Sequence, residues 1–131
     1  MSVIEIFEGK KERFNYVYKK ISPKKLINLI SANIAQRFGI FISEIQPIDI
    51  QLETTRGCNF KCVMCDAWKF KRISFLHLEE AKRILNQFNS SIFLTPYGIG
   101  EPFLNKHIYD IVRYASFKLK FIVGITSNFS V

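Results

Sequence analysis

Apolar and polar residues recur along the chain with two different periods, and each period predicts a different kind of element. Residues 26–38 carry apolar side chains at helical spacing, with Ser22 and Pro23 before them and Gly39 after them. Serine is a favoured N-cap, proline fits the first helical position, and glycine readily ends a helix. We therefore expect a helix from Pro23 to the residue before Gly39. The preceding residues 1–21 fit a strand or a helix equally well.

From the middle of the chain onward, predicted strands and helices alternate. Period-two alternation and short apolar runs indicate strands, and amphipathic stretches between them indicate helices. The predicted strands are residues 48–53, 91–95 and 121–125, and the predicted helices are residues 78–88 and 108–115. The last strand is a continuous apolar run, so we expect it to be buried on both faces. This order predicts an α/β fold with a parallel sheet and right-handed crossovers.

The predicted order also indicates an unfinished barrel. No helix or strand follows the third strand to cover it, and parallel sheets are normally covered on both faces. We expect residues 1–45 to form a helical N-terminal extension and residues 46–131 to form the first part of a partial TIM-like (β/α) barrel. On this interpretation the chain is a truncated product, half of a split gene or a fragment, and is marginally stable alone.

Composition narrows the class of protein. The chain has 131 residues, of which 48% are hydrophobic, so it has enough material for one core. No apolar run approaches the ~20 residues of a membrane span, and the first residues lack the order of a signal peptide, so we expect a cytoplasmic protein. The net charge is +8. No nucleic-acid motif accompanies it, so a solvated basic face is the preferred interpretation.

Three cysteines carry the most specific chemical signal. Cys58, Cys62 and Cys65 have the spacing C-x3-C-x2-C, which is too clustered and odd in number for a disulfide framework. They follow a predicted strand, at the edge where α/β folds place their chemistry. Three thiolates on one loop can bind three irons of a cubane cluster and leave the fourth iron open.

Two other interpretations of the cysteines remain. A structural zinc site needs a fourth ligand, and the only histidines, His77 and His107, form no paired motif. Cys62 and Cys65 alone fit a redox-active dithiol, which leaves the third cysteine unexplained.

A second motif follows the second predicted strand directly. Residues 98–102 read Gly-Ile-Gly-Glu-Pro, and glycines at such a place allow the backbone to approach a ligand closely. The simpler interpretation is a loop that caps a helix, with Glu101 near its positive end.

Together, the cysteine spacing and the Gly-Ile-Gly-Glu-Pro loop resemble the signatures of the radical S-adenosylmethionine (SAM) superfamily. The resemblance implies that Cys58, Cys62 and Cys65 bind a [4Fe–4S] cluster whose open iron holds SAM. It also implies reductive cleavage of SAM to a 5′-deoxyadenosyl radical that abstracts hydrogen from a substrate. By the same resemblance, the residues assigned to SAM are Gly100, Glu101, Pro102, Met64, Ser127 and Asn128. No catalytic side chain is assigned.

The resemblance further implies an electron donor and a peptide or small-molecule substrate. Similar proteins often carry a C-terminal extension with auxiliary clusters. Because the predicted barrel is incomplete, we expect the chain alone to turn over SAM poorly. The alternative hypothesis is a non-catalytic metal-binding module, with iron–sulfur or zinc, that needs a partner chain.

Overall fold

The protein is described by a computed structural model that covers residues 21–130. Predictions for residues 1–20 and for Val131 lie outside these described residues. The helices are α2 (Pro23–Phe38), α3 (Leu78–Leu85) with its continuation η2 (Asn86–Phe88), α4 (Ile108–Arg113) with its π-helical continuation η4 (Tyr114–Lys118), and the short turns η1 (Ala67–Lys69) and η3 (Pro102–Leu104). The strands are β1 (Asp49–Gln51), β2 (Thr55–Arg56), β3 (Ser74–Phe75), β4 (Phe93–Thr95) and β5 (Ile122–Val123).

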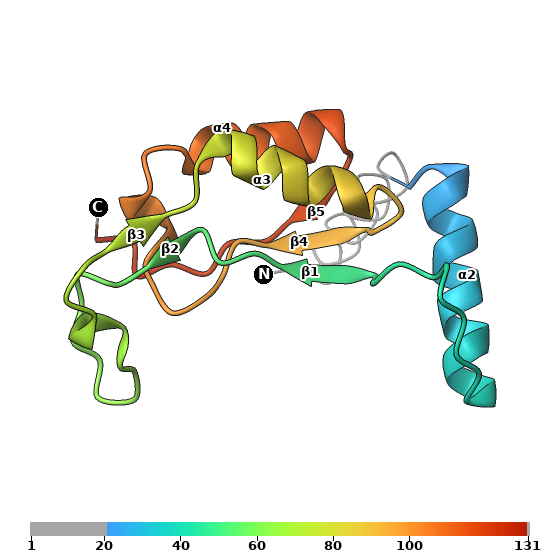
Figure 1. Cartoon of the computed structure of the whole chain (residues 1–131), viewed down its shortest axis with the longest axis horizontal. Coiled ribbons are helices and arrows are strands. Elements are labelled where there is room, and N and C mark those ends of the chain that lie inside the picture. The colour runs from blue at the N-terminus through green and yellow to red at the C-terminus, as the bar shows by residue number, and fades with distance from the viewer. Residues whose placement is uncertain (1–20, 131) are drawn as a thin grey trace, which may run out of the picture.

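The alternation of strands and helices is confirmed. Strands β1, β4 and β5 form a parallel sheet in that order, with Ile50 opposite Leu94 and Leu94 opposite Val123. Helices α3 and α4 lie side by side over one face of this sheet (Figure 1). The buried core between the two layers consists of Ile50, Leu52, Ala81, Leu85, Leu94, Ile111, Ala115 and Phe121. The period-two pattern of β1 therefore buries one set of side chains beneath the helices.

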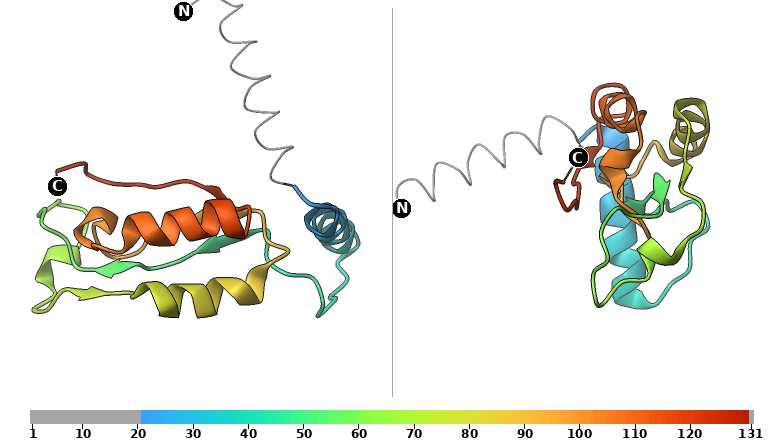
Figure 2. Two further views of the ribbon diagram at one scale, coloured as in Figure 1. Left: turned by 90° about the horizontal axis from the view of Figure 1, so that it is seen from above. Right: turned by 90° about the vertical axis from the view of Figure 1, so that its left-hand side faces the viewer.

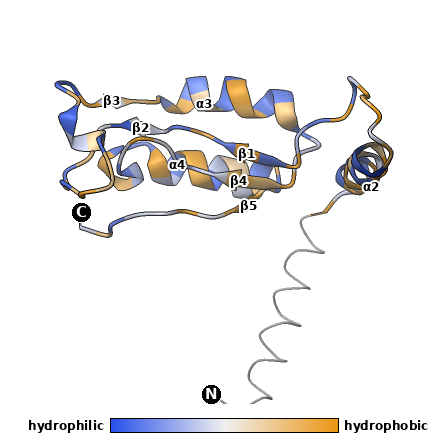
Figure 3. Cartoon of the chain, turned by 90° about the horizontal axis from the view of Figure 1, so that it is seen from below, coloured by the Kyte–Doolittle hydropathy of each residue, from blue (hydrophilic) through white to orange (hydrophobic). Residues whose placement is uncertain are grey.

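The opposite face of the sheet is uncovered among the described residues. Asp49 and Gln51 are exposed there, and so is Phe93. Figure 3 views the molecule from this side. The prediction that residues 121–125 are buried on both faces is wrong for the described part of the chain. There, helices cover one face of the sheet, and both residues of β5 are half-buried. The described strands form an open sheet, and its closure into a barrel stays a prediction.

Helix α2 begins and ends where its caps predict. The Ser22 side chain accepts a hydrogen bond from the Lys25 amide at 3.4 Å. Gly39 adopts a left-handed conformation with φ of 63°, which suits glycine. Figures 1 and 2 show α2 at the end of the sheet where β1 begins, remote from the cysteine loop. Among the helices of residues 21–130, none has the length and apolar character that crossing a membrane requires.

The buried side of α2 carries two polar residues beside Ala35. Lys25 and Asn28 are buried, whereas Ile27 and Phe38 are 65% and 68% exposed. The Lys25 ammonium donates to the Lys120 carbonyl at 3.0 Å. Lys25 is thus an exception to the predicted solvated basic face, because a backbone carbonyl replaces part of its water shell.

Asn28 attaches α2 to the amino-terminal edge of the sheet. Its amide nitrogen donates to the carbonyls of Gln46 and Ser90 at 3.0 and 3.3 Å, and its oxygen accepts from the Gln46 amide at 2.9 Å. The Gln46 side chain then bonds to the Ser90 amide and to the Gln87 carbonyl, each at 2.8 Å. Most of the polar capacity at this edge is therefore used by the protein itself.

Candidate metal centre

The cysteines lie on the loop between β2 and β3, at the carboxyl edge of the parallel sheet (Figure 1). Strands β2 and β3 pair antiparallel and close the base of this loop. The sequence pattern predicts no strand or helix between residues 53 and 78. The structure has β2, η1 and β3 there. Strands of two residues form too short a pattern to be recognised in the sequence.

The three cysteines differ in their surroundings. All are free thiols; Cys58 is half-buried, whereas Cys62 and Cys65 are exposed. The Cys65 amide donates to the Cys62 carbonyl at 3.2 Å, which forms a tight turn. Within residues 21–130, no three His, Cys, Asp or Glu side chains are close enough together to hold a metal ion. The structure therefore places the cysteines on one loop but does not bring their sulfur atoms together.

Cys58 is the cysteine that the fold holds. Its sulfur accepts a hydrogen bond from the Phe60 amide at 3.3 Å. The Asn128 side-chain nitrogen lies 3.6 Å from the same sulfur, and Asn59 Oδ1 lies 3.7 Å from it. The segment that follows β5 therefore reaches the first residue of the cysteine motif.

The glycine motif joins the cysteine loop through the backbone. The Gly57 amide donates to the Ile99 carbonyl at 2.8 Å, and the Glu101 amide donates to the Gly57 carbonyl at 3.1 Å. A Cβ on Gly100 would lie 2.7 Å from the Gly57 oxygen and closer still to the Thr55 oxygen. Only glycine permits this close approach. Gly57, the residue before the first cysteine, is therefore joined directly to the backbone of the glycine motif.

Glu101 is buried, with 2% of its surface exposed. One carboxylate oxygen accepts from the Phe103 amide at 3.0 Å and from the Ser127 hydroxyl at 2.7 Å. The other accepts from the Asn128 amide at 2.8 Å. A carboxylate offers about four acceptor positions, so the second oxygen retains capacity for another donor. Pro102 is buried beside it and begins η3.

Sequence reasoning missed two polar residues around this site. The Ile99 amide donates to Glu53 Oε1 at 2.9 Å, so Glu53 helps to hold the glycine motif. The alternation of residues 48–53 was a usable signal, since it places Glu53 on the polar face of the strand.

The second is Asn105, which is fully buried. Its amide nitrogen donates to the Thr54 and Leu76 carbonyls at 2.7 and 2.9 Å, one on each side of the cysteine loop. Its oxygen accepts from the His107 amide at 2.9 Å. Spacing along the chain gives no signal for such a clamp.

Two buried hydroxyls lie beside this clamp. The hydroxyls of Thr54 and Thr55 have no hydrogen-bond partner within the described residues. They belong to residues that line a polar depression of about 270 Å³, together with Glu53 and Arg56. The carboxyl edge of the sheet therefore still has unused polar groups.

The tip of the cysteine loop is open to water. Met64 is 96% exposed, so the thioether that the resemblance assigns to SAM is not buried in this structure. Trp68 is 41% exposed, with the Lys61 and Lys69 ammonium groups 5.7 and 5.6 Å from its ring centre. Both distances are within the range of cation–π interactions, here at a surface site.

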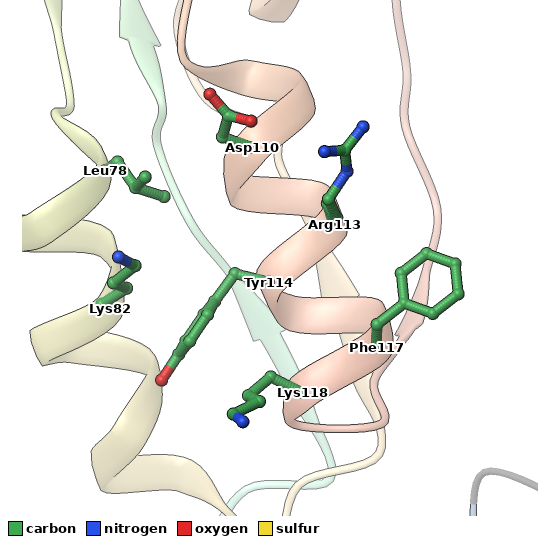
Figure 4. Close-up of a pocket in the computed structure, with 7 residues that line it drawn as sticks. All are labelled: Leu78, Lys82, Asp110, Arg113, Tyr114, Phe117 and Lys118. Atoms are coloured by element: carbon green, nitrogen blue, oxygen red, sulfur yellow. The ribbon is translucent and has the colours of Figure 1, made fainter.

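Two other features lie outside the cysteine loop. The ring centres of His77 and His107 are 5.2 Å apart, and these residues are the N-caps of the neighbouring helices α3 and α4. A groove of about 360 Å³ runs between α3 and α4 (Figure 4). Its Lys82 already pairs with Glu79, and its Tyr114 hydroxyl already donates to Asn86. The groove contains no metal ligand of the cysteine or histidine type.

Comparison with known proteins identifies the family. A family model described as the Radical SAM superfamily matches residues 52–131, which include the cysteine motif, the glycine motif and the end of the third strand. Comparisons with curated proteins and with solved structures found no match. Because the match covers more than half of the chain, the protein belongs to the radical SAM superfamily.

Proposed function

We propose that Cys58, Cys62 and Cys65 bind a [4Fe–4S] cluster, and that the neighbouring glycine motif binds SAM. The observation that supports this best is the pair of backbone hydrogen bonds between Gly57 and residues 99–101. It places the residue before the first cysteine against the motif assigned to SAM, as a shared site requires.

The donor set fits such a cluster. Three thiols on one loop supply three ligands, and family members leave the fourth iron for SAM. Residues 59–66 are exposed, so gathering the three sulfurs would rearrange a surface loop and leave the buried core unchanged. Cys58 is already held and serves as the fixed ligand. When bound, the cluster supplies the electron for reductive cleavage of SAM.

The residues near Gly100 suit the amino-acid end of SAM. The close backbone approach at Gly100 presents carbonyl oxygens, and the Glu101 carboxylate has remaining acceptor capacity for an ammonium group. Ser127, in the segment after β5, orients that carboxylate through its hydroxyl. Pro102 fixes the turn that follows, and Met64 is free to cover the adenine from the loop tip.

The reaction class is hydrogen abstraction from a peptide or small molecule by the radical derived from SAM. The exposed loop gives an electron donor access to the cluster, and free thiols suit a reducing compartment such as the cytoplasm. We further propose that the described sheet belongs to a TIM-like barrel core that begins near residue 46, after an N-terminal extension.

The test is anaerobic reconstitution with iron and sulfide. The expected result is a brown protein with about four irons and four sulfides per chain. Adding SAM should then change the electron paramagnetic resonance spectrum of the reduced cluster. Zinc bound at one ion per chain, with no iron retained, would overturn the proposal and favour a zinc-binding interaction module.

A further inference from the structure

The amide nitrogen of Asn128 points at the sulfur of Cys58. It lies 3.6 Å from that sulfur and 3.1 Å from Asn59 Oδ1. Seventy positions separate Asn128 from Cys58 along the chain, so the fold itself creates this contact. We propose that Asn128 is a positioning residue that donates an N–H hydrogen bond to Cys58 and raises the reduction potential of the cluster. This inference rests on the proposed function.

The orientation of the Asn128 amide is set by its other contacts. Its oxygen accepts from the Ser130 amide at 3.0 Å and from the Ser130 hydroxyl at 2.7 Å. Because both donors hold the oxygen, the nitrogen end faces Cys58. The Asn128 backbone amide bonds to Glu101 at 2.8 Å, which fixes the residue as a whole.

Cys58 is the ligand whose surroundings the described fold controls. It is half-buried, and its sulfur accepts a hydrogen bond from the Phe60 amide at 3.3 Å in addition to the contact with the Asn128 side chain. Cys62 and Cys65 are exposed to water. A donor placed on Cys58 is therefore less screened than one placed on either of the other two thiolates.

The physical effect has a definite sign. A one-electron reduction takes an electron from an external reductant and leaves more negative charge on the cluster and its sulfur ligands, with no proton required. An N–H donor stabilises that added charge, and hydrogen bonds to sulfur are among the factors that set cluster potentials. Losing the Asn128 donor should disfavour the reduced state about tenfold, which is about 59 mV for a one-electron couple.

The test compares reconstituted Asn128→Leu with the unaltered protein. Leucine has a similar size but no donor. Iron and sulfide are measured first, and the potential is then titrated with dithionite while the cluster is followed by electron paramagnetic resonance. We expect a retained cluster with a potential lower by about 59 mV. The matched control is Asn33→Leu on α2, where the asparagine is exposed and donates to the Leu29 carbonyl within its own helix. Its potential should be unchanged.

The outcomes separate the inference from the proposed function. An unaltered protein without iron would refute the proposed function. A fully loaded Asn128→Leu protein with an unchanged potential would refute only the role of Asn128. If Asn128→Leu loses its cluster, two milder variants decide. Asn128→Asp exchanges the donor for a charged acceptor and should lower the potential at least as far, and Ser130→Ala loosens the amide and should lower it less. Unchanged potentials in both would overturn the inference.

Discussion

The two edges of the parallel sheet are each held by a buried asparagine, but the polar groups around the two asparagines are used differently. At the amino edge, Asn28 and Gln46 bond to each other and to the backbone of Ser90. At the carboxyl edge, Asn105 bonds to both sides of the cysteine loop, yet the hydroxyls of Thr54 and Thr55 beside it have no hydrogen-bond partner among residues 21–130. Most polar groups at the amino edge are thus used by the protein itself, while the carboxyl edge retains capacity for ligands, as the carboxyl edge of α/β sheets generally does.

Substitution of the cysteines should have the largest effect at the carboxyl edge. Replacing any one of Cys58, Cys62 or Cys65 by alanine should abolish retention of the cluster, because three ligands on one loop leave none to spare. Iron and sulfide analysis after reconstitution measures this directly. Full iron content in Cys58→Ala would assign the metal to the other two cysteines and contradict the proposed ligand set.

Asn105→Ala should lower the free energy of unfolding by about 2–4 kcal/mol, since it removes three hydrogen bonds from a fully buried side chain. It should also reduce cluster retention, because the base of the cysteine loop loses its clamp. Urea denaturation and iron analysis measure the two effects. A variant that loses stability but keeps its full iron content would show that the clamp serves folding alone.

Glu101→Ala should weaken SAM binding roughly 10- to 150-fold, the usual worth of about 1.5–3 kcal/mol for a charged hydrogen bond. The cluster itself should remain, because Glu101 bonds to no cysteine. Titration of SAM against the reduced, reconstituted variant measures the affinity. Unchanged affinity would reduce the Glu101 carboxylate to a structural link between the glycine motif and the segment after β5.

Asn28→Ala completes the comparison at the other edge. It should cost about 1–2 kcal/mol of unfolding free energy, because Gln46 and Ser90 retain their own side-chain bond. Iron content and SAM affinity, corrected for the folded fraction, should be unchanged. A loss of iron from folded Asn28→Ala protein would mean that the amino edge shapes the site after all.

Local signals predicted the fold better than they predicted its assembly. Ser22 and Gly39 marked the limits of α2 because capping depends on neighbouring residues alone. The spacing of apolar residues found the helix but not which side faces the sheet. The buried side carries Lys25 and Asn28, whose partners lie far away in sequence. Their burial depends on carbonyls that only the folded chain brings near.

The candidate site likewise has features that local sequence predicts and contacts that only the folded chain makes. The cysteine and glycine motifs were visible because their chemistry requires particular residues at short spacing. The contact of Asn128 with Cys58 and the clamp of Asn105 were not visible, since each joins segments at least 29 residues apart. Sequence spacing is the basis of the proposed ligand set, and only the folded chain shows the contacts that surround it.

The backbone bridge at Gly57 has a consequence for the energetics of the proposed site. Its amide and carbonyl join the cysteine loop to residues 99–101, so a change in one loop shifts the conformational equilibrium of the other. Binding at two coupled loops is reciprocal: the factor by which a bound cluster tightens SAM is the factor by which SAM tightens the cluster. If this coupling acts on the dissociation rate, the protein saturated with SAM would release iron more slowly than the protein without SAM. SAM would then stabilise the cluster that cleaves it.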